Sequence, residues 1–408
     1  MATPLCRHFG PCGGCDTQHL TYGEQLERKH KVLRDLLVRA LDDPALAIEP
    51  FIGMRVNDTG WPWEFRHKAS FVFGDAEDRR ELTIGHYAAR SKRIVPIVEC
   101  PVHASRANRL AFALHSHLAK GGVSAAGPDL RGVLRHLIVR TTRDDREAVA
   151  MLVVTRNDKS LRAPIRAFLA TEEAPDGFYL NLNAKPGPFM VGRDTMRLAG
   201  RSHVREQVAG ASFLISPTTF FQTNVEAAET LLRLAIEGIA AAPQRVLDLY
   251  AGSGLFTVPL AVKGHHVTAV EENPQAMRDA EQNLRLNRVD PAAVRLRTAR
   301  VEDALRQSRR DRYDLVILDP PRSGCTPAVV QTVFGTIRPP RAVYISCNPL
   351  ALAAELPAIV KLGYRIDRLQ PVDMFPHTSH IETVVSLERS KLAGLKARAT
   401  RSQRSAGL

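Results

Sequence analysis

The chain has 408 residues, 44% of them hydrophobic and 24% charged, which is ordinary globular composition and enough for two or three domains. Its formal net charge of +13 favours a polyanionic partner. We see no signal peptide and no long apolar run, so we expect a soluble, cytoplasmic protein that is a monomer. The six cysteines are then expected to be ligands, catalysts or packing residues and not disulfides.

Three cysteines open the chain in the pattern Cys6-x5-Cys12-x2-Cys15, with glycines between them. Glycines allow the tight turns that let thiolates converge on one metal centre. A fourth thiolate is needed, and Cys100 is the best candidate because the other two cysteines belong to later motifs. The spacing is not the common paired zinc spacing, so we favour a [4Fe–4S] cluster over zinc.

The first half of the chain predicts a short amino-terminal segment and a strand-rich domain. Residues 1–47 hold the cysteine loop and a helical pattern over 21–41. Residues 48–210 carry short strand-like runs separated by glycine, proline and charge clusters, with strands expected at 69–73, 134–140, 148–154 and 178–182, and helices at 105–120 and 160–171. Basic residues near aromatic ones in this domain could line an RNA groove or be scattered solvated charge: Arg66, His67, Lys68, Arg90, Lys92 and Arg93.

The remaining chain predicts an α/β domain over residues 211–388 and a basic, disordered tail over 389–408. From Pro243 onward strands and helices alternate, which is typical of a doubly wound, mainly parallel sheet. We expect its strands at 245–250, 266–270, 294–298, 313–318, 342–346, 364–369 and 382–387.

The first strand of this domain leads into a glycine loop, Asp248-x3-Gly252-x-Gly254, which lets a ligand approach the backbone closely. Glu271 ends the next strand, at about the spacing expected for a carboxylate that binds a ribose diol. Thr257 stands where the dinucleotide fingerprint has its third glycine. The loop therefore favours S-adenosylmethionine over NAD.

Two later strands end in residues that can do chemistry. Cys347 follows the strand 342–346, and open α/β sheets bind ligands at the carboxyl ends of their strands. The thiol can therefore act as a nucleophile once it ionises, although a small buried hydrophobe is the competing interpretation. Asp319 begins the stiff turn Asp-Pro-Pro-Arg322, and its carboxylate is expected to face the same cleft or to be a structural strand end.

These motifs together resemble the RNA uracil-C5 methyltransferases, which make 5-methyluridine in transfer or ribosomal RNA. The resemblance is to the iron–sulfur branch without an amino-terminal barrel, and it runs through most of the chain. Besides the cysteines and the glycine loop, it includes Phe220-Phe221-Gln222-Thr223-Asn224, Asp319–Arg322, Ser346–Pro349 and His380-Ile381-Glu382-Thr383.

The resemblance implies S-adenosylmethionine-dependent methylation of uracil C5 through a covalent Cys–C6 adduct. It implies Cys347 as the nucleophile and Glu382 as the base. It assigns the cofactor to Gln222, Tyr250, Glu271 and Asp319, and a [4Fe–4S] cluster to Cys6, Cys12, Cys15 and Cys100. Two other interpretations stay open: an amino-group nucleobase methyltransferase, which uses a similar acidic-Pro-Pro turn, and a non-catalytic RNA-binding protein.

Overall fold

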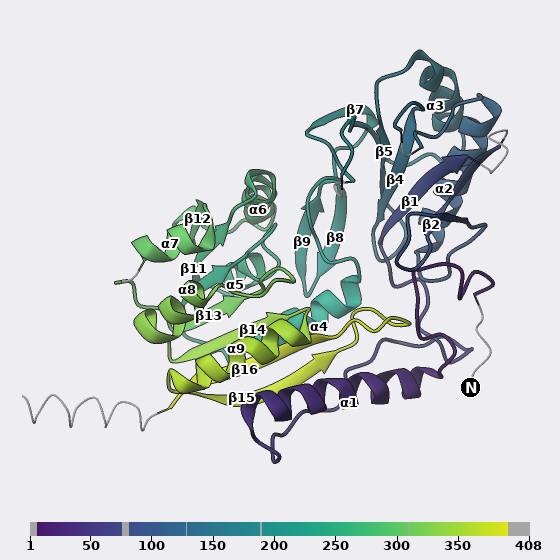
Figure 1. Cartoon of the computed structure of the whole chain (residues 1–408). Helices are drawn as coiled ribbons and strands as arrows, with labels where there is room; N and C mark the ends of the chain where they lie inside the picture. Colours follow the sequence, from purple (N-terminus) through teal and green to yellow (C-terminus); the bar gives the residue numbers. More distant parts are fainter. Residues whose placement is uncertain (1–5, 76–80, 128, 188–189, 309, 391–408) are drawn as a thin grey trace, which may run out of the picture.

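The computed structural model describes residues 6–75, 81–127, 129–187, 190–308 and 310–390. Two seven-stranded sheets, each with its own helices, make up most of the molecule, and the small hairpin β8–β9 lies between them (Figure 1). From residue 391 on, the tail that we predict to be disordered lies outside the described residues. Within those residues, no helix combines the length and the apolar character needed to cross a bilayer.

The chain begins with the cysteine loop and then forms α1 (Tyr22–Leu41). A capping box starts this helix, because the Thr21 hydroxyl accepts from the Glu24 amide while the Glu24 carboxylate accepts from the Thr21 amide. Leu33 and Leu37 are fully buried in the core under the second sheet. Figure 1 shows α1 running along the side of that sheet, next to β15.

The first sheet comes from the predicted strand-rich domain and has the order β3-β2-β1-β4-β5-β6-β7. Its strands are β1 (Lys68–Asp75), β2 (Leu82–Tyr87), β3 (Ile94–Pro96), β4 (Leu134–Thr141), β5 (Ala148–Val154), β6 (Gly177–Leu182) and β7 (Asp194–Gly200). The helix α2 (Ser105–Lys120) packs on this sheet. β5 and β6 pair in parallel because the short turn Lys159–Leu161 and α3 (Arg162–Leu169) connect them, whereas the other described pairs are antiparallel.

A two-stranded hairpin and one helix connect the sheets. The hairpin consists of β8 (Val204–Val208) and β9 (Ala211–Ile215), which pair antiparallel, and α4 (Val225–Ile236) follows. Asn224 caps this helix and also donates its amide to the carbonyl of Met374, in the loop before the last strand. The connection is therefore anchored to the second sheet.

The second sheet has the order β12-β11-β10-β13-β14-β16-β15. Its strands are β10 (Arg245–Leu249), β11 (His266–Glu271), β12 (Val294–Thr298), β13 (Leu315–Leu318), β14 (Arg341–Ser346), β15 (Tyr364–Val372) and β16 (Glu382–Arg389). Between them lie α5 (Thr257–Val262), α6 (Pro274–Leu286), a short turn (Pro291–Ala293), α7 (Val301–Gln307), α8 (Pro327–Val330), a π-helical segment (Gln331–Ile337) and α9 (Pro349–Lys361). All pairs from β12 to β14 are parallel, and β16 and β15 join antiparallel, so the prediction of a doubly wound, mainly parallel sheet is confirmed.

A buried ion pair joins α1 to the loop that connects β15 and β16. The Lys29 ammonium lies 2.6 Å from the Asp373 carboxylate, and the two side chains are 4% and 0% exposed. Lys29 also donates to the Phe375 carbonyl at 3.0 Å, and the Tyr22 hydroxyl donates to Asp373 at 2.9 Å. Because every charge in this group has a partner, the pair can be buried, but the loss of one member leaves an uncompensated charge.

We predict that Lys29→Met lowers the free energy of unfolding by about 3–5 kcal/mol, because Asp373 would stay buried without its counter-ion. A urea titration measures this loss. Lys31→Met, at an exposed position of the same helix, should change it by less than about 0.5 kcal/mol. Adding Asp373→Asn to Lys29→Met should recover part of the lost free energy of unfolding. If Lys29→Met and Lys31→Met had equal effects, the prediction would be contradicted.

Candidate functional site

Cys347 lies in the turn between β14 and α9, at the carboxyl edge of the second sheet. The strand before it is buried, and Asn348 starts the helix by accepting from the Leu350 amide at 3.1 Å. Asn348 also donates to the Arg322 carbonyl at 2.8 Å, which ties this turn to the turn after β13. The Cys347 thiol is half-buried and is therefore still accessible.

Glu382 and Asp319 lie next to this thiol. Thr383 of β16 pairs with Ser346 of β14, so in this antiparallel register Glu382 stands opposite Cys347. The Glu382 side chain is 3% exposed. Asp319 directly follows β13, which pairs in parallel with β14. The structure thus brings together three of the residues that we predicted from the sequence.

Burial and mutual repulsion set the protonation of these groups. Burial first, and then the charge of Asp319, raises the pKa of Glu382 well above its usual range. Burial, together with Asp248, raises the pKa of Asp319 to about 7. Burial raises the pKa of Cys347 to about 11, with contributions from Glu382 and Asp319, while Arg322 acts in the opposite direction. In the free protein at neutral pH the thiol is therefore protonated.

The glycine loop after β10 turns sharply, with a left-handed backbone at three residues. Gly252 and Gly254 have φ values of +55° and +92°, and Tyr250 has +64°, in the region that non-glycine residues seldom occupy. The Glu271 carboxylate accepts from the Gly252 amide at 3.0 Å, so this predicted ribose ligand already touches the loop. Asp248 is fully buried and accepts from the Thr257 hydroxyl at 2.5 Å, which fits a residue that steadies the loop.

The predicted cofactor residues come from four elements. Tyr250, Glu271 and Asp319 follow or end three adjacent parallel strands, β10, β11 and β13, so they share the carboxyl edge of the sheet. Gln222 is buried and lies in the segment between β9 and α4. Of the two aromatic residues before it, Phe221 belongs to the core, whereas Phe220 is 62% exposed.

The four predicted metal ligands line one cavity of about 500 Å³, together with residues of the first sheet. Burial raises the pKa of Cys15 to about 11 and that of Cys100 to about 12, and repulsion among the thiols adds to both shifts. Four thiols around one cavity are a suitable donor set for a metal centre, whose positive charge would stabilise them as thiolates.

Sequence reasoning missed two histidines beside these cysteines. His86 Nδ1 lies 3.5 Å from the Cys12 sulfur, and the ligand atoms of His86, Cys100 and His103 all lie within 4.8 Å of one another. His86 Nε2 and His103 Nδ1 are buried and have no hydrogen-bond partner among the described residues. Both histidines can therefore support or join the metal ligands, and only their place in the fold, not their spacing in the sequence, reveals this.

The structure places the predicted basic residues in three different environments. Arg66 and Lys68 line the cysteine cavity, and within the described chain neither forms an ion pair. Arg66 Nε is buried and has no hydrogen-bond partner there, and burial, followed by the charge of Arg140, lowers the pKa of Lys68 to about 8. The other members, Arg90, Lys92 and Arg93, are exposed on the turn between β2 and β3, and His67 is buried.

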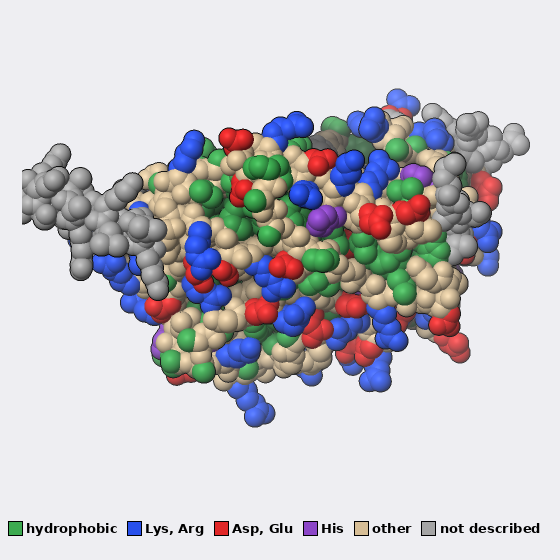
Figure 2. Space-filling view, turned by 90° about the horizontal axis from the view of Figure 1, so that it is seen from below, with side chains coloured by type: hydrophobic (Ala, Val, Ile, Leu, Met, Phe, Trp, Pro, Cys, Tyr) green, Lys and Arg blue, Asp and Glu red, His purple; other side chains and the backbone are tan. Residues whose placement is uncertain are grey.

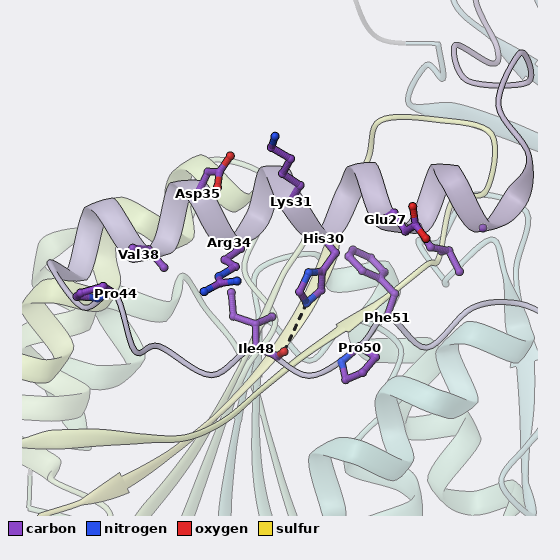
Figure 3. Close-up of a pocket in the computed structure, with 12 residues that line it drawn as sticks. Glu27, His30, Lys31, Arg34, Asp35, Val38, Pro44, Ile48, Pro50 and Phe51 are labelled. Atoms are coloured by element: carbon purple, nitrogen blue, oxygen red, sulfur yellow. Dashed lines mark hydrogen bonds between the residues drawn. The ribbon is translucent and has the colours of Figure 1, made fainter. Parts of the chain in front are cut away.

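A second cavity, of about 950 Å³, lies between α1 and the segment 44–51. Figure 3 shows acidic and basic side chains along it, and His30 pointing to the Ile48 carbonyl at 3.4 Å. None of the predicted catalytic, cofactor or metal residues lines this cavity. Cavity volume alone therefore does not identify the site, and the chemistry lies elsewhere.

Known proteins are similar to this chain in sequence. Residues 193–390 match the family model described as tRNA (Uracil-5-)-methyltransferase. An uncharacterised RNA methyltransferase of Gloeobacter violaceus is 36% identical over 382 residues, covering 93% of this chain and 81% of the relative. Another, from Halalkalibacterium halodurans, is 32% identical over 391 residues and covers 94% and 82%.

A solved structure is similar along nearly the whole fold. The crystal structure of Pyrococcus abyssi tRNA (uracil-54, C5)-methyltransferase in complex with S-adenosyl-L-homocysteine superposes with a TM-score of 0.76 at 28% identity, and the match covers 95% of this chain and 86% of that one. The chain is an RNA methyltransferase and belongs to the RNA uracil-C5 methyltransferase family.

Proposed function

We propose that the protein methylates uracil C5 in RNA with S-adenosylmethionine, through a covalent bond between Cys347 and C6. The observation that carries this proposal is the placement of Cys347 opposite Glu382 and beside Asp319, at the sheet edge that also holds the glycine loop. An amino-group methyltransferase needs the acidic turn but no thiol, so the half-buried thiol favours C5 chemistry.

The chemistry explains why a thiol and a carboxylate are both needed. C5 of uracil is a poor nucleophile. After the half-buried Cys347 thiol loses its proton to solvent, addition of the thiolate to C6 makes C5 enolate-like. C5 then attacks the methyl group, which the cofactor supplies. The Glu382 carboxylate removes the C5 proton, the electron pair of that bond re-forms the C5–C6 double bond, and the C6–S bond breaks to release the thiolate.

Three of the proposed cofactor residues lie at the carboxyl edge of the second sheet, and Gln222 lies in the segment between β9 and α4. Glu271 would bind the ribose diol, Tyr250 and Gln222 would contact the remainder of the cofactor, and Asp319 would lie between the sulfonium and the uracil. The homocysteine cofactor product bound in the Pyrococcus abyssi enzyme supports this choice of ligand. Burial raises the pKa of Asp319 to about 7, and a neighbouring cation would stabilise the charged form of this carboxyl group.

We propose that Cys6, Cys12, Cys15 and Cys100 hold a [4Fe–4S] cluster, because all four line one cavity. The cluster would organise the amino-terminal loop and the adjacent RNA surface, and no step of methyl transfer needs it. Zinc remains the competing metal, and His86 and His103 make a mixed Cys/His site chemically possible.

We place the RNA against the first sheet and the cysteine loop, where Arg66 and Lys68 line the cavity and form no ion pair with any of the described residues. The face in Figure 2 is a less suitable surface, since basic and acidic side chains alternate across it. Transfer RNA is the first substrate to test because the family model and the Pyrococcus abyssi enzyme carry that name, and ribosomal RNA is the alternative.

The decisive experiment uses 5-fluorouridine-substituted transfer and ribosomal RNA with S-adenosylmethionine on a denaturing gel. Fluorine at C5 cannot leave as a proton, so we expect a covalent protein–RNA band that is absent in Cys347→Ala. Cys325→Ala, which changes a buried thiol outside the predicted set, is the control and should still give the band. Methylation of RNA by Cys347→Ala would instead support the amino-group enzyme.

The reactivity of the thiol should depend steeply on pH. Because the pKa of Cys347 is raised to about 11, iodoacetamide should label it slowly at pH 8 and about tenfold faster per pH unit above that. Asp319 has a pKa of about 7 and is charged at pH 9, so Asp319→Asn should accelerate labelling there. Peptide mass spectrometry measures the labelling rate. Glu172→Gln, at an exposed position, is the control. A labelling rate that is constant between pH 7 and 10 would contradict the raised pKa of Cys347.

Anaerobic purification should give a brown protein with about four irons per chain. Cys100→Ser should lose most of this iron because it removes one of the four proposed ligands, whereas Cys325→Ser should retain it. Metal analysis and the visible spectrum measure both results. A colourless protein that contains zinc would overturn the cluster assignment.

A further inference from the structure

The loop 373–381 joins β15 to β16 and ends directly before Glu382. His377, in the middle of this loop, is fully buried and has a left-handed backbone with φ of +65°. A non-glycine residue holds such a conformation only where its surroundings enforce it, and such positions cluster at functional sites. His377 is not among the groups that touch the reacting atoms in the proposed mechanism, so its constraint needs another explanation.

The cysteine loop holds the backbone of His377. The amides of Asp16 and Thr17, which directly follow Cys15, both donate to the His377 carbonyl, at 2.9 and 3.2 Å. The Asp16 carboxylate also accepts from the Ser379 hydroxyl at 2.8 Å. These contacts join two segments that are more than 350 residues apart in the chain.

The side chain of His377 is held equally firmly. Its Nε2 lies 2.9 Å from the Pro62 carbonyl, and its Nδ1 lies 3.4 Å from the Gln25 amide of α1. Burial lowers the pKa of His377 to about 4, so the ring is neutral, with Nε2–H donating to Pro62 and Nδ1 accepting from Gln25. Gln25 also accepts from the His377 amide at 2.9 Å, and the Trp63 ring packs 4.4 Å from the imidazole.

We propose that His377 is a positioning residue that fixes the loop 373–381 to the cysteine loop and α1, so that Glu382 can reach the C5 proton. The inference rests on the proposed function and concerns only its last step. Addition of Cys347 and methyl transfer come before that step and use the turn after β14. When Glu382 does not take the proton, the C5–H and C6–S bonds both persist, and the methylated RNA stays attached to the protein.

The test compares His377→Ala with wild type on two RNAs. On ordinary RNA with methyl-labelled S-adenosylmethionine, turnover should fall at least about tenfold, less than the roughly 10²–10⁴-fold that loss of a general base costs. A methyl-labelled covalent complex should accumulate on a denaturing gel. On 5-fluorouridine RNA, where no proton is removed, trapping should stay within about twofold of wild type.

Three further variants separate positioning from loss of structure. His377→Asn should restore release of product, because asparagine tolerates the left-handed backbone and keeps a polar group. His266→Ala, at an exposed histidine at the start of β11, should behave as wild type. Gln25→Leu removes the hydrogen-bond partner of His377 on α1, so the covalent complex should accumulate in this variant too. This variant tests the proposal if His377→Ala does not fold. Iron content and cofactor binding should match wild type in all of them.

Two results would overturn the inference: slow turnover without the covalent complex in His377→Ala and Gln25→Leu, or fluorouridine trapping that falls as far as turnover does. The first would mean that the loop does not control the base, and the second that it affects the whole site. Failure of the wild-type protein itself to trap fluorouridine would have a different meaning, since it would refute the covalent mechanism. The two RNAs therefore distinguish failure of the inference from failure of the proposed function.

Discussion

The crowding of acids around one thiol is the constraint on which the active site depends. Asp319 and Glu382 approach Cys347 from two strands of one sheet, and Asp248 in turn raises the pKa of Asp319. Burial raises the pKa of all four groups. Arg322 is the cation that opposes the shifts of Glu382 and Cys347. A thiolate and two carboxylates cannot all be charged here without a further positive charge, because each repels the others in a site shielded from water.

On the proposed arrangement, that positive charge is the sulfonium of S-adenosylmethionine beside Asp319. It stabilises the charged form of the acid and reduces the repulsion that keeps Cys347 protonated. Transfer of the methyl group removes this charge. When Glu382 then takes the C5 proton, its carboxylate becomes neutral while the departing thiolate becomes charged, so release of the thiolate leaves the total negative charge of the site unchanged. The arrangement of acids therefore favours formation of the adduct only in the loaded site. It also keeps the thiol unreactive in the free protein.

The sequence predicted those parts of the fold and of the site that depend on short local patterns of residues. Buried apolar runs such as β10 and β14 alternate with capped helices, so the second sheet could be predicted, as could residues at strand ends such as Glu271. β7 was missed because it is largely exposed and lacks an apolar face. β2 was missed because Gly85 interrupts it, although a Cβ there would lie 1.9 Å from the Val95 carbonyl of β3, so this close pairing needs glycine.

The remaining parts of the site depend on contacts between distant segments, for which no local pattern exists. Two such contacts join Lys29 to Asp373 and Gln25 to His377, and the partners in each pair lie more than 340 residues apart in the chain. In the sequence, each of these residues resembles an ordinary polar residue. The loop 373–381 lies between β15 and β16, and the amino-terminal segment holds it through an ion pair, backbone amides and a glutamine. Closing so long a chain segment costs little more entropy than closing one of half its length. The amino terminus can therefore support the last strand, and with it the base, at small conformational cost.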